Sequence, residues 1–293
     1  QAAAVLAERW TPLVVRELML LVPQGDPSKS WQLQLDVPLQ QLAADIFLYA
    51  VDQQNLRYKT DTYLLAQNSA AHVDRMMKVA RLKYAGNWNP EPGGWRRLAT
   101  YLLNNQHLAL TGETVTPGQG KLAGYRLATL TGTTSFTLSD AARSELKDYL
   151  AHGGTLVIDA AGGSTEFAAS AEAELDALVG PDAARLLPAN HPAYTLPTSP
   201  IKEFTYRQFA QSRLGRINTP LIRGVDINGR TAVFYSPEDL SGGLVGEQID
   251  GITGYSPKTA TETMANLVQY AGNARAMRSK PSVETFPPRS RLS

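Results

Sequence analysis

Residues 154–167, GTLVIDAAGGSTEF, decide the fold. The stretch begins as a nearly all-apolar run, which favours a strand at the buried centre of a parallel sheet. It continues into the glycine pair Gly162 and Gly163, which predicts a tight turn, and a helix is predicted to follow over residues 167–179. Ser164 therefore stands between strand and helix, where many α/β enzymes place a nucleophile or bind a phosphate.

Strands and helices alternate on both sides of this stretch. KVARLKY and YRLATLTG, which begin at Lys78 and Tyr125, are typical of strands. The helix predicted between them has an apolar face formed by Trp95, Leu98, Ala99, Leu102 and Leu103. A second helix is predicted to begin after Ser139, which can cap it, and to end at Gly153. The alternation predicts a doubly wound, mainly parallel α/β sheet, in which ligands usually lie beyond the carboxyl ends of the strands.

A hairpin and a final helix are predicted near the end of the chain. RGVDI and RTAVFYS flank Asn228-Gly229, a pair that strongly favours a two-residue hairpin turn. Ser256 and Pro257 then supply the cap and the first position of an amphipathic helix.

The two ends of the chain resemble one another. Residues 44–59 read ADIFLYAVDQQNLRYK, and residues 265–280 read ANLVQYAGNARAMRSK. The segments that precede these two stretches also agree in order. Residues 13–22 and 31–37 are typical of two strands, and Pro38 then opens a helix, just as the predicted hairpin at Asn228-Gly229 precedes the helix that Pro257 opens. Chance similarity between two amphipathic helices is the alternative explanation.

The chain is therefore expected to have three parts. Residues 1–75 would be a partial copy of the main domain, made of a hairpin, a helix and a linker. Residues 76–278 would form the main α/β domain, and residues 279–293, which contain three prolines and no helical period, an extended tail. The first residue is Gln1, which suits either a removed leader or a cut from a longer chain.

The composition excludes several classes of function. Hydrophobic residues make up 43% of the 293 residues and charged residues 19%, which is enough for a sizeable core. Lys and Arg number 28 against 27 Asp and Glu, so no basic field exists to bind nucleic acid. The chain has no cysteine, which removes disulfides, thiolate metal sites and a cysteine nucleophile. No apolar run approaches the roughly 20 residues of a membrane span.

Four motifs follow one another along the chain: LKYAGNWNPEPGGWRRL, LTGTTSFTLSDAARSELKDYLAHGGTLVIDAAGGS, the His-Pro pair of ANHPAY, and FYSPEDLSG. Together they resemble one uncharacterised bacterial family, the domain of unknown function 4159. The resemblance covers about residues 78–273 and keeps the family's order. It implies a flavodoxin-like sheet of the class I glutamine amidotransferase superfamily, in proteins that are often exported or associated with the cell envelope. It also implies that His191 lies near the ends of the strands.

Ser164 is the first candidate for catalysis. A nucleophile elbow favours small residues on both sides of the serine, but Glu166 stands two residues after it. A serine nucleophile needs a nearby base, and His191 is the best candidate, with Asp239 as a further carboxylate. In the alternative interpretation, Ser164 only caps the following helix and His191 is bonded to the backbone.

A divalent ion is the second possibility that the residue types raise. The potential ligands are Asp159, Glu166, His191, Glu238 and Asp239. Their spacing matches no metal-binding signature such as HExxH or an EF-hand loop. Solvated or capping carboxylates are the usual role of such residues, so neither a metal nor a cofactor is predicted.

Two strand-to-helix turns are candidates for binding an anion. Thr131, Gly132 and Thr133 follow one strand, and Gly162 and Gly163 follow the next, so their backbone amides can point at a ligand. Neither turn has the glycine and lysine spacing of a nucleotide site.

Aromatic residues offer a different kind of ligand surface. Trp88 and Trp95 both lie in the segment NWNPEPGGW. Trp95 falls on the inward face of its helix and is expected in the core, whereas Trp88 is a candidate for contact with a sugar or a peptide. A packed loop is the alternative for Trp88.

These features together favour a non-catalytic module of an exported, periplasmic or envelope-associated bacterial protein. It would associate with other protein chains, including copies of itself, or bind a ligand. One alternative is a hydrolase or transferase with a cleft around Ser164, Glu166, His191 and Asp239. The other is a carbohydrate-binding module that uses Trp88.

Overall fold

The computed structural model describes residues 65–247 and 251–277, all of which belong to one compact unit of the chain, residues 65–293. Residues 1–64 of the predicted partial copy, which is expected to span residues 1–75, lie outside the described residues. The predicted tail at 279–293 lies outside them as well. The division into three parts therefore stays a prediction.

The described residues contain a seven-stranded sheet with the order β2-β1-β3-β4-β7-β6-β5. The first five strands in this order are parallel, and β6 and β5 continue the sheet in antiparallel pairs. This is the predicted flavodoxin-like α/β architecture. The strands are β1 Arg75–Leu82, β2 Leu108–Val115, β3 Leu127–Gly132, β4 Thr155–Ala160, β5 Arg185–Leu186, β6 Arg223–Ile227 and β7 Arg230–Ser236.

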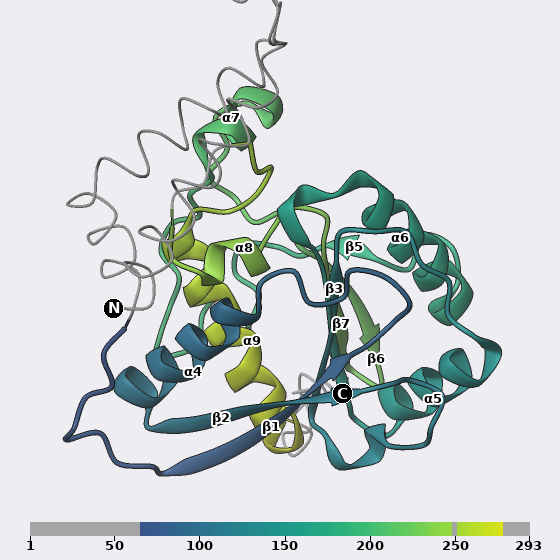
Figure 1. Ribbon diagram of the computed structural model, residues 1–293, viewed down its shortest axis with the longest axis horizontal. Helices are drawn as coiled ribbons and strands as arrows, with labels where there is room; N and C mark the ends of the chain where they lie inside the picture. The colour runs from purple at the N-terminus through teal and green to yellow at the C-terminus, as the bar shows by residue number, and fades with distance from the viewer. Residues whose placement is uncertain (1–64, 248–250, 278–293) are drawn as a thin grey trace, which may run out of the picture. The chain divides into compact units, whose positions relative to one another are not determined.

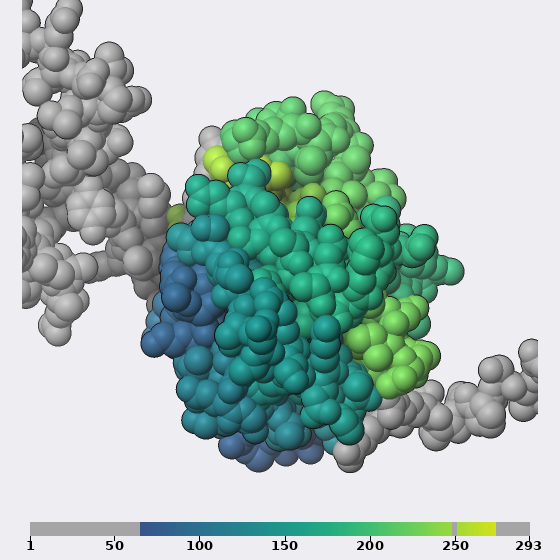
Figure 2. Space-filling view, turned by 90° about the vertical axis from the view of Figure 1, so that its right-hand side faces the viewer, coloured from purple at the N-terminus to yellow at the C-terminus, as the bar shows by residue number. Residues whose placement is uncertain are grey.

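Helices cover both faces of this sheet (Figure 1). Helices α4 and α9 pack on one face, and α5 and α6 pack on the other, where their atoms occupy the centre of Figure 2. The helices are α4 Pro92–Gln106, α5 Asp140–Ala151, α6 Thr165–Val179, α7 Gln208–Leu214, α8 Ser241–Leu244 and α9 Pro257–Met277. Two 3-10 turns, η1 Leu122–Gly124 and η2 Ala161–Gly163, lie in the loops.

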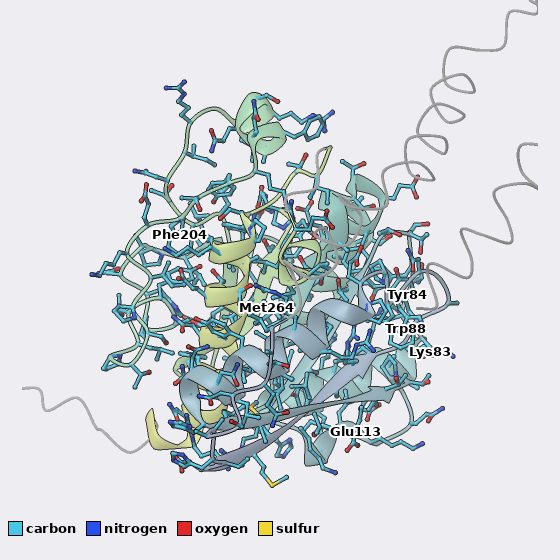
Figure 3. All side chains as sticks on the ribbon, turned by 60° about the vertical axis from the view of Figure 1, so that its left-hand side comes forward. Lys83, Tyr84, Trp88, Glu113, Phe204 and Met264 are labelled. Atoms are coloured by element: carbon cyan, nitrogen blue, oxygen red, sulfur yellow. The ribbon has the colours of Figure 1, made fainter. Side chains whose placement is uncertain are left out.

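Each face has its own apolar core. Leu98 and Leu102 of α4 pack with Met264 and Val268 of α9, while α5 and α6 build the second core from residues such as Phe167. The described side chains of α9 are buried almost throughout, because the segment before β6 covers its outer side. Figure 3 shows this arrangement, with Phe204 of that segment outside Met264.

Several local predictions are confirmed. The Ser139 hydroxyl accepts a hydrogen bond from Ala142 N at 3.2 Å and so caps α5. The hairpin between β6 and β7 turns at Asn228 and Gly229, whose φ angles of 53° and 74° belong to the left-handed region that this turn requires. Helix α9 begins at Pro257, as its sequence predicts.

Strand β2 is the main element that the sequence does not predict. Its sequence, LALTGETV, contains a central glycine, and its second half lacks apolar alternation. The connection from β2 to β3 contains only the short turn η1, whereas the other connections between parallel strands contain α-helices. Strand β2 forms one edge of the described sheet, beside β1.

Candidate functional site

The carboxyl ends of β1, β3, β4 and β7 meet along one edge of the sheet, which is termed the carboxyl edge here. The chain passes from β1 outward to β2 and then back across β1 to β3, so the topological switch point lies between β1 and β3. Ligands of doubly wound folds usually bind at this position. The loops that follow the four strands carry most of the predicted site residues.

Ser164 lies in the loop after β4 and is fully engaged in local structure. Its hydroxyl accepts a hydrogen bond from Phe167 N at 3.3 Å and donates one to Thr133 O at 2.6 Å. Gly162 and Gly163 adopt φ angles of 70° and 72°, which confirms the predicted tight turn. The interpretation of Ser164 as the cap of α6 is confirmed.

Asp239 is completely buried after the end of β7, and three backbone amides donate hydrogen bonds to its carboxylate. Its Oδ1 accepts from Gly162 N at 2.7 Å and from Gly242 N at 2.9 Å, and its Oδ2 accepts from Gly243 N at 3.1 Å. Burial raises the pKa of Asp239, and these N–H donors act against that rise. Asp239 thus links the loop after β4 to the start of α8.

Asp159, at the end of β4, is held in the same way. Its carboxylate accepts hydrogen bonds from Leu240 N at 2.8 Å and Ser241 N at 2.9 Å, and also from the hydroxyls of Ser241 and Thr131. Burial and the neighbouring Asp239 raise the pKa of Asp159 to about 7. We call Asp159 and Asp239 with their donors the aspartate cluster.

The candidate anion loop after β3 is also occupied by internal bonds. Thr133 N donates to Asn87 O at 3.2 Å, and Thr133 Oγ1 accepts from Asn87 Nδ2 at 2.8 Å. A side chain on Gly132 would meet Asn87 O at 2.6 Å, so the loop after β1 packs directly on Gly132. Thr131, Gly132, Thr133, Gly162 and Gly163 therefore lie on one edge, as predicted. Their hydrogen bonds connect the loops that follow β1, β3, β4 and β7 to one another.

His191 does not join these residues. Its Nε2 lies 3.0 Å from the hydroxyl of Thr231, the second residue of β7, and its Nδ1 accepts from Ala193 N at 3.2 Å. Thr231 lies at the opposite, amino edge, about 17 Å along the strand from Ser236 at a rise of roughly 3.3 Å per residue. The position that the resemblance implies for His191 is thus corrected: it is a buried core histidine, and burial lowers its pKa.

The remaining predicted ligands are scattered as well. Glu166 is exposed in the first turn of α6, while Glu238 is buried beside β7. Within residues 65–247 and 251–277, no group of three or more acidic, histidine or cysteine side chains is placed to hold a metal ion. The oxygens of the two buried aspartates accept hydrogen bonds from backbone amides and, for Asp159, from two hydroxyls.

The residue that sequence reasoning missed is Arg81, near the end of β1. The residue is only 9% exposed, and its guanidinium carbon lies 4.9 Å from the ring centre of Trp95 and 5.9 Å from that of Trp88. Among the described residues it forms no ion pair, and its Nε has no hydrogen-bond partner. Burial lowers the pKa of Arg81 to about 10.

Two further buried donors surround Arg81 without a partner among the described residues. Trp95 Nε1 belongs to the ring that lies against the guanidinium, and Thr129 Oγ1 belongs to the residue paired with Arg81 on β3. Arg81, Trp88, Trp95 and Thr129 are termed the arginine site. Figure 3 shows Trp88 beside Tyr84, at the end of the molecule where β1 ends.

The energetics of the arginine site favour an additional partner for Arg81. Each cation–π contact contributes about 0.5–2 kcal/mol, so two contribute a few kcal/mol at most. Partial removal of the guanidinium from water is costly, and each unpaired buried donor among Arg81 Nε, Trp95 Nε1 and Thr129 Oγ1 adds about 1–3 kcal/mol. The rings alone do not balance this cost, whereas an anion would accept from several of these donors at once.

A hollow elsewhere on the molecule also contains arginine side chains, but these have hydrogen-bond acceptors. One of about 560 Å³ opens at the amino edge and is lined in part by Tyr149, Arg126 and Arg230. Arg126 donates to Gly272 O at 2.5 Å, and Arg230 donates to Thr155 Oγ1 at 3.0 Å. Both cations have acceptors within the fold, whereas none is found for Arg81 Nε in the part of the chain that the structure describes.

Comparisons with known proteins place the chain in a family without assigning a function to it. The family described as domain of unknown function (DUF4159) matches residues 78–271, which include the whole carboxyl edge. No curated protein matches the chain significantly. Across the part of the chain that the structure describes, no helix is long and apolar enough to cross a membrane.

Proposed function

The chain belongs to the family of the domain of unknown function DUF4159, and on that premise we propose that it is a non-catalytic ligand-binding module whose arginine site binds a carboxylate. The observation that carries this proposal is the burial of Arg81 without an acidic partner among the described residues. A buried charge without a counter-charge is costly, and ligand binding at this position relieves that cost.

A carboxylate fits the arginine site better than a phosphate does. The planar guanidinium can bind both oxygens of a carboxylate side by side. Arg81 supplies a single positive charge, which matches one carboxylate, whereas a phosphate dianion would retain an unbalanced charge in a buried position. Trp88 and Trp95 add apolar surface on either side, which suits an organic acid.

Other features support binding without catalysis. Ser164, the best candidate nucleophile, uses its hydroxyl to cap α6, and His191 lies at the other edge of the sheet. The carboxyl edge is further crossed by hydrogen bonds from Asn87 to Thr133 and from Gly162 to Asp239. The bond of Asn87 fixes the loop that carries Trp88, the ring beside Arg81, which reduces the conformational entropy lost when a ligand binds.

The test is the thermal unfolding midpoint in sodium acetate, compared with sodium chloride at equal ionic strength and with acetamide as the neutral analogue. At a concentration about tenfold above Kd, acetate should add about 1.4 kcal/mol of stability, which corresponds to roughly 2–4 °C. The shift should vanish in Arg81→Met and persist in Arg96→Met, which removes an exposed arginine of α4. Equal shifts in both variants would refute the proposal.

We further propose that the domain belongs to the class I glutamine amidotransferase superfamily, and that the protein is exported or associated with the cell envelope. The strand order β2-β1-β3-β4-β7 supports membership of this superfamily, because it has the 2-1-3-4-5 pattern of flavodoxin-like sheets.

Export or association with the cell envelope is supported by the sequence resemblance alone. Cell fractionation with an antibody against the chain would test it, and a purely cytoplasmic signal would contradict it.

A further inference from the structure

The two edges of the described sheet differ in how they are protected. Strand β5 has only two residues, and very short edge strands are a common protection against further pairing. Strand β2 has eight residues, all in register with β1 from Arg75↔Leu108 to Leu82↔Val115 without a bulge. Within the described residues, β2 pairs with β1 alone.

Strand β2 also lacks the usual chemical protections of an edge. Its sequence, LALTGETV, contains no proline and no lysine. Its one charged residue, Glu113, is engaged by Lys78 Nζ at 2.8 Å and by the Tyr125 hydroxyl at 2.5 Å. An unprotected edge of this length offers main-chain donors and acceptors to another extended segment.

Arg81 lies over the last part of this edge. A side chain on Gly112 of β2 would come within 3.2 Å of Arg81 Cδ, so the stem of Arg81 runs across the strand at that position. Thr114 is the β2 residue in register with Arg81, and it is exposed, as is Gly112. Arg81 and the edge of β2, neither of which has a further partner among the described residues, are therefore parts of one surface.

We infer that this surface binds the C-terminal segment of a partner polypeptide as an added strand along β2, with the terminal carboxylate at Arg81. The inference rests on the proposed function, since it uses the arginine site for the carboxylate. A peptide has its carboxylate at one end only, and Arg81 lies near the carboxyl end of β2. The added strand therefore runs parallel to β2.

Both parts of the surface contribute to recognition in this arrangement. Main-chain hydrogen bonds along β2 supply affinity with little dependence on sequence, and Arg81 selects a chain end over an internal segment. Trp88 lies beside Arg81, where it can contact the last side chain of the peptide.

The experiment uses the full chain and four forms of one acetylated peptide of alternating threonine and valine, about six residues long, with a lysine pair at its start for solubility. The first form ends in a free carboxylate and the second in an amide. The third keeps the carboxylate but carries N-methyl groups on alternate residues, and the fourth carries them on the intervening residues. Titration calorimetry measures each affinity for the wild type, Arg81→Met and Arg96→Met.

The free-acid peptide should bind the wild type and Arg96→Met equally, and at least about tenfold more weakly to Arg81→Met, which corresponds to about 1.4 kcal/mol. Amidation should cause a similar loss in the wild type. One of the two N-methylated peptides should also bind at least about tenfold more weakly than the free acid, because it has lost the amide donors that face β2.

The outcomes separate the inference from the proposed function. If both N-methylated peptides bind as well as the free acid, strand addition is overturned while the carboxylate site stands. If the amide binds as well as the acid, the inference is overturned, and the acetate measurement alone then decides whether the arginine site binds carboxylates. Dimerisation of the chain that the peptide cannot dissociate would assign β2 to a second copy and would also overturn the inference.

Discussion

The carboxyl edge contains buried charge at two places, and the two are treated in opposite ways. The carboxylates of Asp159 and Asp239 are surrounded by N–H and O–H donors from α8 and the loop after β4. The guanidinium of Arg81 has two aromatic rings as neighbours and no acidic partner among the described residues.

This difference separates a structural role from a binding role. A buried charge whose hydrogen-bonding capacity is filled by the fold stabilises the loops that fill it. A buried charge whose capacity is unfilled leaves free energy available to a ligand. The aspartate cluster should therefore matter for stability, and the arginine site for binding.

The largest expected effect is that of Asp239→Ala. The substitution leaves the buried amides of Gly242 and Gly243 and the part-buried amide of Gly162 without their acceptor, which should cost about 3–5 kcal/mol of unfolding free energy. Urea unfolding would measure the loss, with Glu166→Ala as an exposed control. A loss below about 1 kcal/mol would show that the cluster does not hold the loops.

The second effect is a dependence of stability on pH that arises from Asp159. Its pKa is raised from 3.8 to about 7, so the folded chain retains a proton that the unfolded chain releases. The unfolding free energy should therefore fall as pH rises from about 4 to 7, by up to about 1.4 kcal/mol per pH unit for one proton.

Other buried groups also contribute to this pH dependence, so it is measured as a difference between variants. Asp239 and Glu91 have raised pKa values and act in the same direction, whereas His191, whose pKa is lowered, acts in the opposite direction below about pH 6.5. Urea unfolding from pH 5 to pH 8 should give a smaller slope for Asp159→Asn than for the wild type. Identical slopes would contradict the assignment.

Ser164→Ala should have a smaller effect. The variant loses the cap of α6 and the bond to Thr133 O, which should lower the unfolding free energy by about 0.5–2 kcal/mol. Binding at the arginine site should be unchanged in the acetate measurement. A loss of acetate binding with intact stability would restore Ser164 as a functional residue.

The smallest expected effect on stability, and the one of opposite sign, is that of Arg81→Met without ligand. Removal of a charge that has no acidic partner among the described residues should leave the unfolding free energy unchanged or raise it by about 1 kcal/mol, because the desolvation cost that is relieved exceeds the contribution of the lost cation–π contacts. Urea unfolding of the ligand-free protein checks this. A decrease of more than about 2 kcal/mol would identify Arg81 as a structural residue.

Much of the fold could be predicted because its signals are local. The apolar run before Gly162 gives β4, Asn228-Gly229 gives the hairpin, and Pro257 opens α9. Strand β2 could not be predicted in this way. Its central Gly112 leaves space for the stem of Arg81, a contact between neighbouring strands that periodicity within one strand does not reveal.

The candidate site was harder to predict for a related reason. The sequence places Thr131 and Gly162 correctly at the carboxyl edge, since Thr131 lies at the end of β3 and Gly162 follows β4. His191 lies in a long segment between β5 and β6, and nothing local tells which edge of the sheet such a segment reaches. Arg81 could be noticed as a charged residue inside an apolar strand, but its lack of a partner depends on residues far along the chain.

The most direct test of the central claim is the NMR resonance of the Arg81 Nε–H group, assigned by its absence in Arg81→Met. In the free protein this donor is buried without an acceptor among the described residues. The account predicts that acetate shifts the resonance downfield in a saturable manner as a hydrogen bond forms, and that acetamide does not. If the Arg81 Nε–H resonance stays in place at acetate concentrations that shift the resonances of other arginine side chains, the account is contradicted.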